Sequence, residues 1–229
     1  MNQLILPYQK NIKRTFDSFF SDNDKNLQIV DSLKNIFDRE NSQTYLWGQK
    51  CSGKSHLLYS ACNYYSKKNK KCIYLPLKEK NMFGDDILNS FVDYDLICID
   101  DIDEIFGINN WEYSFFVLIN KILEKSKKII FTSSSSLALN KINLKDLQSR
   151  ISWGLIYMIE NPNENIKKSI INKIVSENDY NISTNVIDYL LNNKERDTFF
   201  LIENIHKIGR YSLSLNKKIS VRDLKLIIN

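Results

Sequence analysis

Residue types that build metal sites and covalent-catalytic sites are scarce in this chain of 229 residues. Its four cysteines form no CxxC pair and it has only two histidines. We therefore expect neither a structural zinc site nor a disulfide framework, and predict buried thiols instead. Two histidines, with no nucleophile motif around a serine or cysteine, also argue against a hydrolase triad.

Long hydrophobic runs are absent as well. No segment approaches the eighteen or so apolar residues of a membrane span. The N-terminal sequence MNQLILPYQKNIKR carries its charges after a short apolar patch, the wrong order for a secretory signal. Hydrophobic residues make up 43% and charged residues 26% of the chain, a globular composition that excludes wholesale disorder. We therefore predict a soluble, cytoplasmic protein with no membrane partner.

Arginine is the scarce base. Of 32 basic residues only six are arginine, in a lysine-rich composition typical of AT-rich codons. The net charge of +5 is therefore weak evidence for nucleic-acid binding. An arginine that persists in such a chain points to a need for its planar, five-donor guanidinium. The six are Arg14, Arg39, Arg150, Arg196, Arg210 and Arg222.

Short apolar runs alternate with longer amphipathic stretches over the first two thirds of the chain. The runs predict strands at Thr44–Trp47, Cys72–Leu77, Leu96–Ile99, Ile129–Thr132 and Leu155–Ile159. Helical patterns lie between them at His56–Lys67, Asp85–Phe91 and Trp111–Lys125. This alternation predicts an α/β fold with a mostly parallel sheet that is buried on both faces.

The pattern changes after Pro162. Isoleucines then recur at helical spacing over 166–174, and the last helix is expected to begin at a capping box, Ser220–Asp223. We predict a small all-helical second unit that starts near residue 162.

The segment Gly48-Gln-Lys-Cys-Ser-Gly53-Lys54-Ser55 matches the phosphate-loop pattern GxxxxGK[ST] without a gap. It follows a predicted strand and precedes a predicted helix, as the motif requires. Backbone N–H groups of such a loop surround phosphate oxygens at the helix N-terminus. Lys54 is expected to reach the β- and γ-phosphates, and Ser55 to hold Mg²⁺.

A phosphate loop also needs a carboxylate that positions the metal from a neighbouring strand. Leu96-Ile-Cys-Ile-Asp100-Asp101 supplies one, since four apolar residues end in two acids. We predict that Asp100 supports the Mg²⁺ shell and that Asp101 orients or polarises the attacking water.

The order of these pieces resembles the AAA+ ATPases, and within them the DnaA/Hda family of replication proteins. The resemblance spans nearly the whole chain. Its motifs are Thr15–Phe19 (TFxxF), the strand and loop of 47–57, Ile99–Ile102, Asp146–Gly154 (DLxSRLxWG) and Arg196–Phe199.

The resemblance implies an αβα AAA+ core over 13–161 that binds ADP or ATP with Mg²⁺, followed by a helical lid over 162–229. It implies that Phe16 lies near the base and that Arg196 contacts nucleotide from the lid. Arg150 matches the arginine finger, which projects from one subunit toward the γ-phosphate held by its neighbour. A surface ion pair is the plainer alternative for either arginine.

Residues 1–12 are predicted to form a clamp-binding tail, because Gln3-Leu-Ile-Leu-Pro7 resembles the peptide by which such proteins dock on the DNA polymerase sliding clamp. Leu4 and Leu6 would fill apolar pockets while Gln3 forms a hydrogen bond at the rim. A first strand or a tail that packs on its own domain would look similar. DnaA continues beyond its lid into a helix-turn-helix domain, whereas the sequence stops at Asn229, so we do not expect duplex recognition by such a helix.

Two departures from the family pattern lead us to expect slow intrinsic hydrolysis. Where relatives carry an acidic first sensor after the fourth strand, this sequence has Thr132 followed by Ser133–Ser136, with Ser134 as the nearest match. A plain serine-rich turn fits equally well. Asp101 stands where many AAA+ motors use glutamate as a base.

Taken with the family, these features favour a negative regulator of replication initiation. It would bind nucleotide and the sliding clamp, reach DNA through that clamp, and use Arg150 to promote hydrolysis of ATP held by DnaA. Three alternatives stay open: an autonomous DNA-stimulated ATPase such as a helicase loader, a single-strand-binding module, and a non-catalytic adaptor. Whether ADP or ATP favours the active form, and whether the chain forms a homo-oligomer, also stay open.

Overall fold

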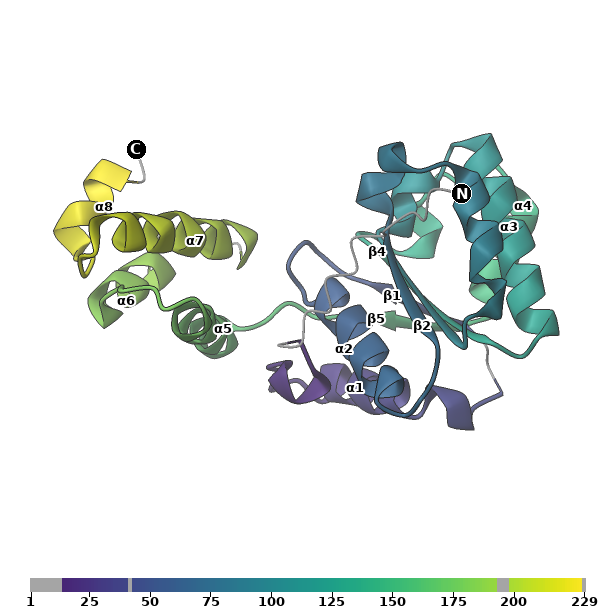
Figure 1. Ribbon diagram of the computed structural model, residues 1–229, viewed down its shortest axis with the longest axis horizontal. Coiled ribbons are helices and arrows are strands. Elements are labelled where there is room, and N and C mark those ends of the chain that lie inside the picture. Colours follow the sequence, from purple (N-terminus) through teal and green to yellow (C-terminus); the bar gives the residue numbers. More distant parts are fainter. Residues whose placement is uncertain (1–13, 41–42, 193–197, 228–229) are drawn as a thin grey trace. The chain divides into compact units, whose positions relative to one another are not determined.

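The computed structural model describes residues 14–40, 43–192 and 198–227 (Figure 1). The chain forms two compact units, each with its own hydrophobic core. The first is an α/β unit that extends to Glu160, and the second is a helical unit that includes the chain from Asn161 onward.

The α/β unit is built on a five-stranded sheet in which every strand pair is parallel. Its strands are β1 (Gln43–Trp47), β2 (Cys72–Pro76), β3 (Leu96–Asp100), β4 (Lys128–Ser133) and β5 (Leu155–Met158). They lie in the order β2-β3-β4-β1-β5. The five predicted strands are confirmed to within one residue at each end. Because β1 lies next to β4, and β4 next to β3, the carboxyl ends of these three strands meet at one edge, where ligands of such sheets usually bind.

Helices cover both faces of the sheet (Figure 1). On one face, α1 (Asp24–Lys34) and α2 (Lys54–Ser66) share a core with the side chains of Leu96 and Cys98. On the other, α3 (Asn109–Glu124) and α4 (Lys145–Ser152) pack with Ile97 and Phe131. Every residue of β3 is buried, which explains its unbroken apolar run.

The edge strand β5 departs from the prediction of a sheet buried on both faces. Ile156 and Met158 are 44% and 51% exposed, while the residues between and before them are half-buried. Successive side chains of a strand point to opposite faces of the sheet, so Ile156 and Met158 share one face, and that face is exposed at β5.

Within residues 14–40 and 43–192 the chain also forms six 3₁₀ helices: η1 (Phe16–Ser18), η2 (Ile36–Asp38), η3 (Leu77–Met82), η4 (Asp85–Asp93), η5 (Ile102–Ile105) and η6 (Leu137–Leu139). The segment predicted as a helix over Asp85–Phe91 is η4. Its two buried side chains, Leu88 and Phe91, are three residues apart, the period at which 3₁₀ side chains align. The spacing of apolar residues in the sequence did not distinguish this 3₁₀ helix from an α-helix.

The second unit contains α5 (Glu164–Glu177), α6 (Thr184–Asn192), α7 (Thr198–Leu215) and α8 (Val221–Ile227). Its core includes Ile171, Val186, Ile205 and Ile208, so the predicted all-helical unit is confirmed over the described residues. Half of the expected capping box is present, because the Asp223 carboxylate accepts a hydrogen bond from the backbone N–H of Ser220 at 2.9 Å. None of the described helices is long and apolar enough to cross a membrane.

Glu112 is a fully buried carboxylate that joins α3 to α4. Its Oε1 accepts backbone N–H groups of Gly107 at 2.6 Å and Asn143 at 3.1 Å. Its Oε2 accepts the N–H of Leu144, the residue that precedes α4, at 2.7 Å. This one side chain therefore satisfies three loop donors and fixes the start of the helix that carries Arg150.

Glu112→Ala is expected to lower the free energy of unfolding by about 3 kcal/mol, because three backbone donors lose their acceptor. Urea denaturation of the full chain measures it. Glu112→Gln keeps one acceptor oxygen and is expected to lose less. If the alanine variant is as stable as the glutamine variant, these hydrogen bonds do not hold α4.

Candidate functional site

The loop between β1 and α2 is fixed by a backbone hydrogen bond to β4 and by the conformation of Gly53. The N–H of Gly48 donates to the carbonyl of Ser133 at the end of β4, at 3.3 Å. Gly53 has φ +104°, in the left-handed region that favours glycine. A Cβ there would lie 2.5 Å from Cε2 of Phe19. Both the backbone and the ring therefore require glycine at position 53.

Lys54 is the first residue of α2 and is only 7% exposed. Its Nζ donates to the carbonyls of Gly48 at 2.7 Å and Gln49 at 2.9 Å. Burial lowers the pKa of Lys54, and the charges of Asp101, Asp100 and Asp103 act against that shift. The ammonium group is thus held inside the loop within the field of three carboxylates.

Asp100 ends β3 and is 3% exposed. The hydroxyl of Tyr74, on β2, donates to its Oδ2 at 2.6 Å, and the hydroxyl of Thr132, on β4, donates to its Oδ1. Burial, and then the charge of Asp100, raise the pKa of the Tyr74 phenol, so the tyrosine stays a donor. Two neighbouring strands therefore fix the orientation of the Asp100 carboxylate.

Asp101 has φ +57°, so its backbone turns sharply away from the strand. Its N–H donates to Oγ1 of Thr132 at 3.0 Å, and its carboxylate pairs with Nζ of Lys78 at 2.7 Å. Burial, and then the charge of Asp100, raise the pKa of Asp101, while the hydrogen bond from Lys78 lowers it. Thr132 thus links both acids, a role that the sequence did not suggest.

A third carboxylate, which the sequence analysis missed, lies in η5. The backbone N–H of Ser134 donates to Oδ2 of Asp103 at 3.1 Å, and the Ser134 hydroxyl donates to the same oxygen. Ser134 was the nearest match to an acidic first sensor, and the structure places a carboxylate directly against it. The only feature of the sequence that could have indicated Asp103 is its place as the third acid in Asp100-Asp-Ile-Asp103.

The segment 15–19 is tied to the start of α2. Nε2 of His56 lies 3.0 Å from the carbonyl of Thr15 and 3.1 Å from Oγ of Ser18. Phe16, which was predicted to lie near the base, is 6% exposed and packs edge-on against Tyr64 in the core. Phe19 is the aromatic residue of this segment whose ring lies against Gly53.

Arg150 lies on α4, where it is half-buried. Its guanidinium lies 4.3 Å from the centre of the Trp153 ring, and that ring is 60% exposed. No ion pair of Arg150 is found among the residues that the structure describes, so the surface ion pair weighed above has no partner there. The remaining predicted residues, Arg196 and those of the tail (Gln3, Leu4, Leu6 and Pro7), lie outside the described residues.

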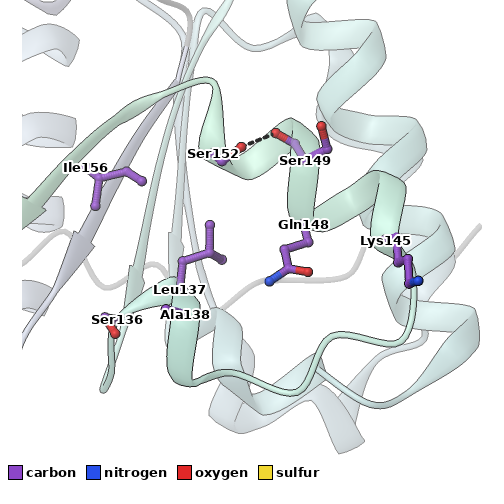
Figure 2. A pocket seen from close by; sticks show the side chains of 8 residues that line it. All are labelled: Ser136, Leu137, Ala138, Lys145, Gln148, Ser149, Ser152 and Ile156. Carbon is purple, nitrogen blue, oxygen red and sulfur yellow. Dashed lines mark hydrogen bonds between the residues drawn. The ribbon is translucent and has the colours of Figure 1, made fainter.

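A shallow groove of about 570 Å³ runs beside α4 (Figure 2). Polar side chains of α4, namely Gln148, Ser149 and Ser152, line it opposite Leu137 of η6 and Ile156 of β5. The groove therefore combines a polar wall from α4, the helix that carries Arg150, with apolar side chains of η6 and β5.

The residues at the sheet edge suit a nucleoside phosphate with Mg²⁺. A glycine loop with its buried lysine suits phosphate oxygens, and the hydroxyl of Ser55 and the carboxylate of Asp100 are the hard oxygen ligands that Mg²⁺ prefers. Ser55 and Asp100 are thus the residues that would hold the metal, while Gly48, Gly53 and Lys54 would hold the phosphates.

Known structures share this fold. Domain III of the replication initiation protein DnaA from Thermotoga maritima matches with a TM-score of 0.81 and 21% identity, over 95% of this chain and 96% of that one. AMPPCP-bound DnaA from Aquifex aeolicus matches with a TM-score of 0.70 and 24% identity, over 95% of this chain and 71% of that one. The predicted α/β phosphate-loop core of AAA+ type with a helical C-terminal part is confirmed.

Sequence comparison gives the family. An uncharacterised protein of Haemophilus influenzae is 30% identical over 229 residues, which is 99% of this chain and 98% of that protein. The family model of the bacterial DnaA ATPase domain matches residues 10–158. The motifs, the fold and this match together place the chain in the bacterial DnaA ATPase domain family.

Proposed function

We propose that this chain binds ADP or ATP with Mg²⁺ at the loop 48–55 and acts as a regulator of DnaA. Docked on the sliding clamp through residues 3–7, it presents Arg150 to the nucleotide held by DnaA and promotes its hydrolysis. Family membership supports the nucleotide part, as does the AMPPCP bound by the Aquifex DnaA.

The observation that supports the regulatory part of the proposal is the surroundings of the Arg150 side chain. Its guanidinium lies on an exposed indole and has no carboxylate partner among the described residues. A planar guanidinium can present two parallel N–H donors to phosphate oxygens. An arginine already neutralised by its own chain would be a poor candidate for such a role in trans. Only one subunit needs to offer this residue, which gives a head-to-tail contact between unlike chains.

The test is hydrolysis of labelled ATP that has been bound beforehand to DnaA. The protein is added with and without sliding clamp loaded on DNA. We expect a loss of bound ATP that depends on the clamp and disappears when Gln3 and Leu6 are both replaced by alanine. If ATP hydrolysis is accelerated equally without the clamp and with both residues replaced, docking through the tail is contradicted.

The outcomes also separate the alternatives. No acceleration, despite measured clamp and nucleotide binding, would favour a non-catalytic adaptor. DNA-stimulated turnover by the protein alone would favour an autonomous ATPase. Neither is the result that we expect from an Arg150 that has no ion-pair partner among the described residues.

A further inference from the structure

Four aromatic side chains form a continuous row beside the C-terminal ends of α1 and α2, which lie side by side on one face of the sheet (Figure 1). From first to last the row is Phe16, Tyr64, Tyr65 and Phe37, and the centres of neighbouring rings lie 5.6, 5.0 and 4.6 Å apart. Phe16 and Tyr65 are buried, and Tyr64 and Phe37 are half-buried. The packing of the core therefore fixes the aromatic row in place.

Lysine ammonium groups lie over this aromatic row. Nζ of Lys34 is 5.8 Å from the centre of the first ring. Nζ of Lys68 is 4.3 Å from the centre of the second ring and 5.6 Å from that of the third, and Nζ of Lys70 is 4.9 Å from that of the last. The face of an aromatic ring attracts a cation but does not cancel its charge. The three charges are therefore gathered in one place and stay available to an anion.

Two of these lysines project from a turn with a defined backbone. Lys68 and Lys70 belong to the turn Lys67-Lys-Asn-Lys-Lys71, which follows α2. The backbone N–H groups of both donate to the carbonyl of Tyr65 at 3.0 Å, and Asn69 between them has φ +61°. Asparagine is one of the few residues other than glycine that visit this left-handed conformation routinely. Every lysine of the turn is exposed.

Few carboxylates offset these charges. Neither of the two turn lysines that lie over the aromatic row forms an ion pair with any residue that the structure describes. Lys34 lies 3.7 Å from the carboxylate of Asp17, which is 92% exposed, and an exposed ion pair of that kind is weak. Asp95, at the end of the turn, is paired with Lys127 at 2.7 Å. Asp38 of η2 is the further exposed carboxylate nearby. Positive charge therefore predominates at this surface.

We propose that Lys34, Lys68 and Lys70 form a contact surface for the phosphate backbone of duplex DNA. Duplex DNA carries one negative charge per about 1.7 Å of helix axis, so several neighbouring ammonium groups can contact several phosphates at once. The rings beneath are covered by the lysines and by the core. They are therefore not free to stack on bases, as binders of single strands require. The contact is with phosphates and carries no base-sequence information.

This surface lies at the far end of α2 from the phosphate loop. The helix has 13 residues and is about 20 Å long at 1.5 Å per residue. The phosphate loop leads into its first residue, Lys54, and the lysine turn follows its last, Ser66. Exposed charges more than about 10 Å apart are largely screened at moderate salt, so DNA and nucleotide are expected to bind independently. Contact with DNA agrees with a chain that works on a clamp loaded on DNA, but it does not depend on that function.

The experiment measures the anisotropy of a short labelled duplex of arbitrary sequence, titrated with the full chain over a range of NaCl concentrations. One triple variant combines Lys34→Gln, Lys68→Gln and Lys70→Gln, and a second places arginine at the same three positions. The matched control combines Lys125→Gln, Lys141→Gln and Lys145→Gln, three exposed lysines elsewhere in the α/β unit. The binding of fluorescent ADP and urea denaturation establish that each variant is folded.

The logarithm of the wild-type affinity is expected to fall linearly with the logarithm of the salt concentration. In the triple glutamine variant the slope should be shallower by about 2.7, at about 0.9 for each lost phosphate contact, and the affinity at low salt should fall at least about tenfold. The arginine variant and the matched control should stay within about threefold of the wild type, because both keep three cations over the rings. Saturation with ADP should leave the affinity for DNA unchanged. Lys68→Gln alone should reduce the slope by about 0.9, which keeps the test valid if the triple variant does not fold.

Several results overturn this surface. The wild type binds no duplex, or its affinity does not depend on salt. The folded glutamine variant binds as tightly as the wild type, or the matched control loses as much affinity as it does. A single strand of the same length binds more tightly than the duplex, or vesicles of anionic lipid bind while the duplex does not. Competition between ADP and the duplex places DNA at the phosphate loop instead. Failure to bind ADP, with the DNA results as expected, refutes the nucleotide site and leaves this surface standing.

Discussion

Lys54→Ala is expected to weaken the binding of ADP and ATP at least about 100-fold, or roughly 2.7 kcal/mol. The side chain is 7% exposed and lies inside the loop. Its charge therefore acts on a bound phosphate through a poorly screened medium, and a hydrogen bond between an ammonium and a phosphate is among the stronger kinds.

The measurement is a titration with fluorescent ADP, together with urea denaturation of the same sample. Urea denaturation separates a loss of stability from a loss of binding, because the variant also removes the hydrogen bonds from Lys54 to the carbonyls of Gly48 and Gln49. Lys68→Ala, in the exposed turn after α2, is the matched control and should bind as the wild type does. Binding by Lys54→Ala within tenfold of wild type would show that the loop does not hold phosphate.

Arg150→Ala is expected to bind ADP and the sliding clamp as the wild type does, yet to lose about 10³-fold or more of the stimulated hydrolysis on DnaA. Arginine fingers contribute 10³–10⁵ in related systems, because they offset the charge of the phosphoryl-transfer transition state. The loss falls on the partner's reaction alone, since the side chain lies on α4 rather than in the phosphate loop of its own chain.

Two further variants test whether the guanidinium group itself is required, or only positive charge on α4. Arg150→Lys keeps the charge but not the planar fork, and it is expected to restore little. Lys145→Ala removes a cation from the exposed face of the same helix and should cost only the few-fold that belongs to charge steering. Equal losses for Lys145→Ala and Arg150→Ala would mean that α4 contributes only general positive charge.

The sequence by itself determined the parts of this protein that depend on local patterns. A buried parallel strand reads as an apolar run, so the strands were predicted to within one residue. The phosphate loop is one contiguous segment, so its motif can be found in the sequence. The glycine that the motif specifies at position 53 is needed because the backbone there has a positive φ. The carboxylates of Asp100 and Asp101 could be placed at the sheet edge because the end of a parallel strand has a fixed position there.

Only the tertiary structure decided which side chains meet. Nothing local distinguishes Phe16 from Phe19, yet one packs in the core and the other lies against Gly53. The predicted helix over Asp85–Phe91 is a 3₁₀ helix because its packing favours a period of three. Glu112 lies in the helix predicted over Trp111–Lys125, where no local pattern marks it as buried; it is fully buried because three loop N–H groups come together around it.

The carboxylates show the same division most clearly. Asp100 and Asp101 were predicted from the sequence and Asp103 was not, and the hydrogen-bond partners of all three could not be predicted because each partner comes from another strand or loop. Tyr74 reaches Asp100 from β2, and Thr132 reaches it from β4. Ser134 reaches Asp103 across 31 positions of sequence. Hydrogen bonds between segments so far apart are fixed by the packing of the sheet, and no local pattern records them.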